Sequence, residues 1–231
     1  GYTSVAYVTE IFPKVFYEMV PDGVVLALLT QQVRSHSADE MSRIHEEARQ
    51  AARSFARAGA DMVILGGVPT NLARGRGSLV DVLADLEQEI GIPVSSSATA
   101  QSNALRALGA EKVGVVHPSN PKRDSFHDRQ VLDDGLEPVG NKSAGATFED
   151  YNRILADRSL QLGRELEQEH PEADTLLFGC PHWPVVHAIE PLERELGVNV
   201  VASLQAIVWE GLRKCGIDDR IMGYGCVLRE H

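Results

Sequence analysis

Positive charge is scarce in this chain of 231 residues. Its 22 Lys and Arg residues face 33 Asp and Glu residues, which gives a formal net charge of -11. Nucleic-acid binding needs clustered Lys and Arg to neutralise phosphates, so this balance argues against a nucleic-acid partner. A small anionic substrate remains compatible, because a local pocket can differ in sign from the whole chain.

Long apolar runs and cysteines are also few. No run approaches the roughly 20 residues of a membrane-spanning helix, and no basic stretch followed by an apolar one opens the sequence. We therefore expect no membrane partner and no secretory leader. The three cysteines, Cys180, Cys215 and Cys226, leave one thiol unpaired even if a disulfide forms, which favours a reduced, cytoplasmic setting.

What the chain does contain is an alternation of apolar strands and amphipathic helices. Its hydrophobic content of 43% suits a globular protein with a sizeable core. The pattern predicts strands at 5–8, 24–29, 61–65, 92–94, 112–116, 175–178 and 198–201, and helices at 38–58, 79–90, 98–108, 123–132, 148–169, 185–196 and 204–214. Continuously apolar strands separated by helices indicate an α/β fold with parallel sheets.

Two parts of the sequence repeat each other. Residues 60–67 match residues 173–180, and residues 86–94 match residues 192–200. The repeat predicts two pseudo-symmetric lobes, the first formed by residues 1–97 plus 206–231 and the second by residues 98–205. Ligands of parallel sheets bind beyond the carboxyl ends of strands, so Gly67 and Cys180 should lie on opposite walls of one cleft.

Cys180 is the strongest catalytic candidate. An apolar run, residues 176–179, delivers this thiol into a turn, and His182 follows two residues later. A free thiol has a pKa near 8.5, which a helix N-terminus or a neighbouring imidazolium lowers. We expect Cys180 to act as an acid or base that His182 orients or activates. The structural alternatives are a buried, apolar cysteine and a packed histidine.

Negative charge that develops on a bound substrate needs preorganised hydrogen-bond donors. Candidate donors are the backbone N–H groups after Gly67 and Cys180; Pro181 has no N–H, which favours the N–H of His182. The predicted substrate-binding residues are Gly67, Val68, Thr70, Asn71, Ser119, Asn120 and Pro181.

Several other residues have two readings. His117 either faces the cleft, where it could act as a base, or caps the turn after its strand. Trp183 either lines the pocket or anchors a helix start. Arg74 and Arg76, in a glycine-rich stretch, either meet a carboxylate or are solvated. This stretch lacks the Lys-Ser/Thr ending of a phosphate loop, so it does not predict nucleotide binding.

Metal ligation is a further alternative for the same segment. Cys180, His182 and His187 are close in sequence, but their spacing matches no standard zinc pattern. We therefore expect neither a metal nor another cofactor. Cys215 and Cys226 have no partner motif and are expected to be structural.

The segment Gly179-Cys180-Pro181-His182-Trp183-Pro184 resembles the second catalytic motif of the aspartate/glutamate racemases, Gly-Cys-Thr-His-Tyr-Pro. Residues 189–198 and 223–225 resemble arylmalonate decarboxylases and maleate isomerases of the same superfamily. The resemblance implies a cofactor-independent enzyme that works at the carbon beside a carboxylate. It also implies a small carboxylate as substrate and is compatible with a homo-oligomer.

This sequence departs from the two-cysteine racemases at Gly67, which occupies the place of the first cysteine. The decarboxylases share that glycine and use only the second cysteine, which protonates the enediolate left by carbon dioxide. They follow the glycine with two hydroxyl residues, where this chain has Val68 and Pro69. Ser119 stands where relatives usually have a tyrosine.

The sequence thus predicts a one-cysteine lyase similar to arylmalonate decarboxylase, with Cys180 as the proton donor. A racemase or cis-trans isomerase is the alternative, and it would need a non-cysteine second base such as His117. A carboxylate-binding protein that has lost catalysis is the third reading, since Val68 and Pro69 supply no hydroxyl groups.

Overall fold

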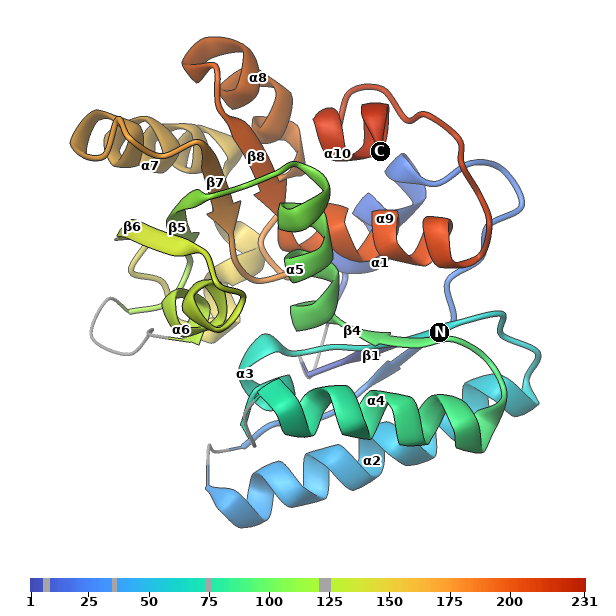
Figure 1. Ribbon diagram of the computed structural model, residues 1–231. Helices are drawn as coiled ribbons and strands as arrows, with labels where there is room; N and C mark the ends of the chain where they lie inside the picture. The colour runs from blue at the N-terminus through green and yellow to red at the C-terminus, as the bar shows by residue number, and fades with distance from the viewer. Residues whose placement is uncertain (6–8, 35–36, 74–75, 121–125) are drawn as a thin grey trace.

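Two four-stranded parallel sheets form the framework of the protein. The computed structural model describes residues 1–5, 9–34, 37–73, 76–120 and 126–231. The first sheet has the order β2 (Leu28–Thr30), β1 (Tyr2–Ser4), β3 (Val63–Leu65), β4 (Val94–Ser96). The second has the order β6 (Glu137–Ser143), β5 (Lys112–His117), β7 (Thr175–Phe178), β8 (Asn199–Ala202). The predicted α/β fold with two parallel-sheet lobes is confirmed (Figure 1).

Helices surround both sheets, and most connect successive parallel strands. They are α1 (Ile11–Met19), α2 (Ala38–Arg57), α3 (Val68–Asn71), α4 (Arg76–Ile90), α5 (Ser97–Ala107), α6 (Phe126–Asp133), α7 (Ala156–Glu169), α8 (Val186–Leu196), α9 (Ser203–Lys214) and α10 (Cys226–Glu230), with a 3₁₀ helix at Phe148–Arg153. Ser37 caps α2, because its Oγ accepts the N–H of Glu40 at 3.3 Å.

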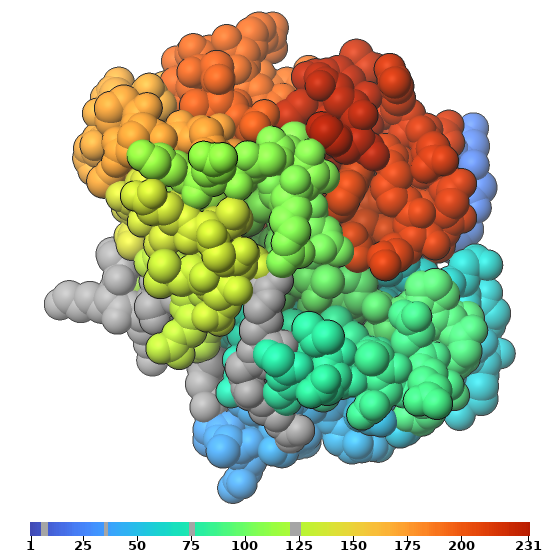
Figure 2. Space-filling view, viewed as in Figure 1, coloured from blue at the N-terminus to red at the C-terminus, as the bar shows by residue number. Residues whose placement is uncertain are grey.

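The internal repeat of the sequence corresponds to a repeat of topology. Each sheet places its first strand between its second and third, and its fourth strand beyond the third. The helices that follow the fourth strands, α5 and α9, pack against each other. Figure 1 shows this pair between the two lobes, and Figure 2 shows the lobes in direct contact.

The hydrophobic core has two parts. A smaller cluster lies under α2 and α4 and includes Phe55, Leu65 and Leu86. The larger cluster joins Tyr2 and Ile64 of the first lobe's strands to the strands of the second sheet and to α5, α8 and α9. The apolar strands are buried because helices cover both faces of the parallel sheets.

The boundaries of several elements differ from the prediction. The first strand is Tyr2–Ser4 rather than 5–8; Val5 already forms a bend, and residues 6–8 lie outside the described part. The strand expected at 24–29 forms only at Leu28–Thr30. The helix expected at 148–169 is interrupted, because Ile154 and Leu155 have extended backbone between the 3₁₀ helix and α7.

Four elements were not predicted, one of them the four-residue helix α3. Strand β6 is an edge strand with exposed and half-buried residues, including Pro138 and Gly140, so it has no apolar run. Helix α1 carries Pro13 near its start, and α10 has only five residues. Among the helices that the structure describes, none is both long and apolar enough to cross a membrane.

Candidate active site

A wide cleft opens where the carboxyl ends of β1, β3, β5 and β7 approach one another, with a volume of about 920 Å³. Residues of both lobes line it: Val5, Val33, Arg34, Gly67, Val68, Pro69, Thr70, Pro118, Ser119, Asn120, Phe126, His127, Gly145, Ala146, Thr147, Phe148, Glu149, Tyr151, Cys180, Pro181 and His182. Cys180 and Gly67 therefore line one cleft, as the repeat predicts.

The turns that carry Gly67 and Cys180 share an unusual backbone. Gly67 has a φ of 85° and Cys180 a φ of 89°, and Cys180 is the only non-glycine residue with positive φ in the described ranges. A side chain in this conformation costs about 1–3 kcal/mol, and such strain is concentrated at functional sites. The thiol is thus held on a turn that glycine forms without strain.

The wall opposite the thiol has no room for a second side chain at Gly67. A Cβ atom there would lie 2.7 Å from Val5 Cγ1 and 3.2 Å from Thr70 Oγ1. Gly67 also precedes α3, whose first-turn N–H groups at Val68 and Thr70 have no partners within the helix. Pro69 has no N–H to offer.

Trp183 anchors the turn of Cys180 from behind. Its side chain is 1% exposed and meets the Phe178 ring edge to face, with the ring centroids 5.5 Å apart. Trp183 is absent from the cleft lining, so its reading as a packing anchor is correct. Cys180 itself is half-buried, and the neighbouring Pro181 lines the cleft beside it.

His182 joins the second lobe to the first. Its Nε2 lies 3.3 Å from Ser4 Oγ, and its Nδ1 lies 3.2 Å from Thr9 Oγ1. Burial lowers the pKa of His182 to about 4, although the Glu10 carboxylate acts in the opposite direction. The imidazole is therefore neutral at pH 7. Burial disfavours the charged ring, and the predicted role of His182 in orienting or activating the thiol stays a prediction.

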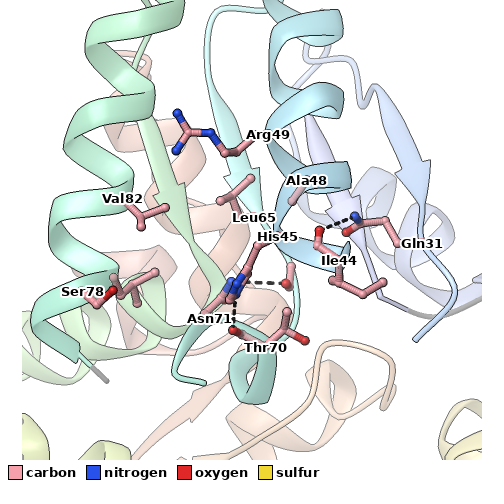
Figure 3. Close-up of a pocket in the computed structure, with 12 residues that line it drawn as sticks. Gln31, Ile44, His45, Ala48, Arg49, Leu65, Thr70, Asn71, Ser78 and Val82 are labelled. Atoms are coloured by element: carbon pink, nitrogen blue, oxygen red, sulfur yellow. Dashed lines mark hydrogen bonds between the residues drawn. The ribbon is translucent and has the colours of Figure 1, made fainter. Parts of the chain in front are cut away.

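The predicted residues of α3 separate into two groups. Val68 and Thr70 line the cleft, whereas Asn71 faces a small internal cavity between α2, α3 and α4 (Figure 3). The Asn71 side chain bonds back to the carbonyls of its own turn and is absent from the cleft lining. In Figure 3, the ring of His45 reaches from α2 to the Thr70 carbonyl oxygen, which lies 2.7 Å from Nε2.

The turn after β5 contributes Ser119 and Asn120 to the cleft, as predicted. His117 is 1% exposed and lies outside the lining, and its Nδ1 is 3.1 Å from Ser119 Oγ. His117 thus supports this turn, in agreement with the capping alternative. Its absence from the cleft lining does not favour a role as a second base.

The remaining candidates lie elsewhere. His187 is exposed and pairs with Glu18 at 3.2 Å, away from Cys180, and the described residues contain no metal-binding group of three or more His, Cys, Asp or Glu. Cys226 is buried, and its Sγ donates to Glu193 at 3.1 Å, which fits a structural role. Arg74 lies outside the described residues, as does the side chain of Arg76.

Sequence reasoning missed most of the lining. Phe126, Phe148 and Tyr151 form an aromatic part of the cleft, and Arg34 and Glu149 are its charged groups among the described residues. Phe148 and Tyr151 fell within a predicted helix, where nothing indicates the break that turns them toward the cleft. For Arg34 a signal existed, since it follows the carboxyl end of a predicted strand.

Comparison with known proteins agrees with the geometry. A family profile described as arylmalonate decarboxylase matches residues 13–228. Arylmalonate decarboxylase of Bordetella bronchiseptica is 29% identical over 185 residues, which cover 78% of this chain and 75% of the relative. Maleate isomerase of Geobacillus stearothermophilus is 22% identical over 196 residues, which cover 82% and 78%. A crystal structure of arylmalonate decarboxylase is similar with a TM-score of 0.81 at 24% identity, covering 99% of this chain and 97% of that one.

The two-lobed fold, the cleft and these relatives define the class as the aspartate/glutamate racemase superfamily, on the branch of the arylmalonate decarboxylases and maleate isomerases. Within that class, the chain belongs to the arylmalonate decarboxylase family. It is accordingly a cofactor-independent decarboxylase or isomerase, as the resemblance of the motifs implies.

Proposed function

We propose that the protein decarboxylates a small malonate-type dicarboxylate and that Cys180 protonates the carbon that loses carbon dioxide. The proposal rests on a difference between the two turns that face each other across the cleft. Cys180 lines the cleft on a strained turn, while Gly67 occupies the equivalent turn without a side chain. Decarboxylation needs a proton donor on one face only, so the lone thiol suffices.

The reaction balances with the groups of this cleft. The bond between the α carbon and one carboxylate breaks, and carbon dioxide leaves. The electron pair stays on the α carbon and spreads into the remaining carboxylate as an enediolate. The Sγ–H of Cys180 gives its proton to that carbon, and the resulting thiolate takes a proton from water.

The carboxylate that stays on the substrate binds to the turns that follow β3 and β5. The N–H groups of Val68 and Thr70, the Thr70 hydroxyl and Ser119 belong to cleft-lining residues. Donors held in place before the reaction stabilise the enediolate more than water does, because they need no reorganisation. They also compensate for the hydroxyl groups that Val68 and Pro69 do not supply.

Apolar surface suits the carboxylate that departs. Val5, Val68, Pro69 and Pro181 present no hydrogen-bonding side chains to the cleft. A carboxylate beside such a surface loses part of its hydration shell. Its conversion to carbon dioxide is then favoured, because the neutral product does not need that hydration. Neutral His182 adds no positive charge beside the turn of Cys180.

Cis-trans isomerisation of a small unsaturated dicarboxylate is the second candidate. The maleate isomerase relative favours it, and a cleft thiol can act as a nucleophile as well as an acid. Isomerisation by proton transfer from His117 is disfavoured, because that ring is buried off the cleft. A carboxylate-binding protein without catalysis would show neither reaction.

A substrate panel separates these functions. The protein is incubated with aryl- and alkylmalonates and, separately, with maleate, while carbon dioxide release and proton NMR spectra are followed. Decarboxylation of a malonate without conversion of maleate to fumarate supports the proposal. Conversion of maleate alone supports the isomerase, and binding without either reaction supports the non-catalytic reading.

A further inference from the structure

Arg34 is a cation that lines the cleft, and its charge also helps to lower the pKa of the nearby Glu40 carboxyl. It follows the carboxyl end of β2, and its exposed side chain lines the cleft. Its backbone N–H donates to Glu40 Oε1 at 2.8 Å, which ties this segment to the start of α2. The backbone is therefore held in place, and the side chain is exposed to solvent at the cleft.

The guanidinium of Arg34 has no ion-pair partner in the described part of the chain. The Glu40 carboxylate is instead engaged by Arg43, at 3.0 Å for Nε and 2.6 Å for Nη2. Arg49 and Arg53 of α2 both pair with Glu89. Arg34 is the only Lys or Arg among the cleft-lining residues that the structure describes.

The opposite charge in the cleft does not neutralise this cation. Glu149 of the second lobe also lines the cleft, but the described structure contains no ion pair between it and Arg34. A chain with a net charge of -11 repels anions at long range, so an unpaired arginine in its cleft offers local attraction that the surface as a whole does not.

The position of Arg34 separates it from the reacting centre. Strand β2 is two strands away from β3, whose turn carries Gly67, and neighbouring strands are about 4.8 Å apart. The strand axes are therefore roughly 10 Å apart. Val5 follows β1, the strand between the two, and Val33 precedes Arg34; both are apolar residues of the cleft lining.

We propose that Arg34 binds a second anionic group, such as a carboxylate, at the far end of the substrate's apolar substituent. This inference rests on the proposed function, because that function places the reacting carbon between Gly67 and Cys180. The substrate class becomes a malonate whose apolar or aromatic substituent ends in an anion. Arg34 then determines specificity without touching the reacting atoms.

The test compares two ligands that lack a malonate group and so cannot decarboxylate in this way: phenylacetate, with one carboxylate, and para-carboxyphenylacetate, with a second one. Their dissociation constants are measured by titration calorimetry with the unchanged protein, Arg34→Met, Arg34→Lys and the control Arg220→Met. Arg220 lies between α9 and α10, is exposed and does not line the cleft. Thermal unfolding verifies that each variant is folded.

The unchanged protein should bind the para-carboxylate about tenfold more tightly, as expected for one charge-assisted pair. This preference should fall to within about twofold in Arg34→Met, remain in Arg220→Met, and weaken with added salt. No preference in the unchanged protein, a preference that survives Arg34→Met, or failure of both acids to bind would overturn the assignment.

The two proposals fail separately. If the preference is present but no malonate is converted, the decarboxylase proposal is wrong and the Arg34 site stands. If simple arylmalonates are converted and no preference for the second anion exists, the Arg34 site is wrong and the decarboxylase proposal stands.

Discussion

At the scale of single residues, the backbone of Cys180 is the feature that the sequence shows least. The matching of residues 60–67 with 173–180 places Cys180 opposite a glycine, and glycine accepts a positive φ without penalty. A cysteine in that place has a strained backbone because it carries a side chain, and the function requires the thiol of that side chain. Stability and function therefore conflict at this one position.

Replacement of Cys180 by glycine and by alanine separates the strain from the thiol. Cys180→Gly should be more stable than Cys180→Ala by about 1 kcal/mol, because alanine keeps the unfavourable positive φ. Urea denaturation measures the difference. Cys226 provides the control, since it begins α10 and glycine there should be less stable than alanine. Equal stabilities at position 180 would show that the turn carries no strain.

The buried His182 makes stability depend on pH. Its pKa of about 4 lies below the ordinary value of 6.5, so the unfolded chain binds more protons between these values. The stabilisation is complete above pH 6.5 and declines as the pH falls toward 4. Protonation of His182 in the unfolded chain should lower the unfolding free energy by about 2 kcal/mol when the pH falls from 7 to 5.

A His182→Gln variant isolates this effect. From pH 7 to pH 5 the unchanged protein should lose about 2 kcal/mol more unfolding free energy than the variant, because glutamine does not titrate. Urea unfolding at the two pH values gives the result. A difference that does not change with pH would mean that the imidazole is not buried in its neutral form.

Sequence reasoning identified Cys180, Gly67, Thr70 and Ser119 because each follows an apolar strand, and strand ends converge in parallel sheets. It could not show that Asn71 lines the small cavity beside α2 instead of the cleft, since one residue along a short helix rotates a side chain by about 100°. It could not assign the protonation of His182, which depends on burial by segments distant in sequence.

At the scale of elements, α3 is too short to be stable by itself. A four-residue helix is held by its surroundings, and the hydrogen bond between His45 Nε2 and the Thr70 carbonyl ties it to α2. Because the acceptor is a carbonyl, the Nε2 of His45 must carry the proton. His45 is therefore a positioning residue for the wall that binds the carboxylate.

Removal of this hydrogen bond should weaken substrate binding more than it slows the chemical step. His45→Ala should raise KM for the malonate about fivefold and leave kcat within about twofold, and it should lower the unfolding free energy by about 1 kcal/mol. His45→Gln keeps an N–H donor and should restore both values. Gln50→Ala, on the same helix, is the control. A fall in kcat with unchanged KM would contradict this role.

The longest periodic elements could be predicted from the sequence, and irregular ones could not. Helix α2 has apolar residues at helical spacing and a serine cap, and its predicted bounds agree with the structure to within a residue. Strand β6 is paired along one side only, so its polar residues give no strand pattern. The break at Ile154 depends on packing that local sequence does not encode.

At the scale of the whole molecule, the larger core cluster extends from Tyr2 and Ile64 of the first sheet to Leu176 and Val201 of the second. The contact of His182 with Ser4 and Thr9 adds a polar connection between the lobes. The cleft thus lies between two units that share a core. The boundaries of the two lobes at residues 97/98 and 205/206 stay a prediction.

A shared core predicts a single unfolding transition. Trp183 follows β7 of the second sheet and Trp209 lies on α9, while circular dichroism reports helices of both lobes. Unfolding in urea followed by tryptophan fluorescence and by circular dichroism should give coincident curves. Two separated transitions would mean that each lobe folds independently and that the shared core contributes little.

The most direct test of the account concerns the proton that reaches the α carbon. α-Methyl-α-phenylmalonate is incubated in deuterium oxide with the unchanged protein and with Cys180→Ala, and the product is analysed by NMR and chiral chromatography. The lone thiol predicts one deuterium at the α carbon, one enantiomer in large excess, and a loss of at least about a thousandfold in rate without Cys180. A racemic product, or decarboxylation that survives Cys180→Ala, would contradict the account.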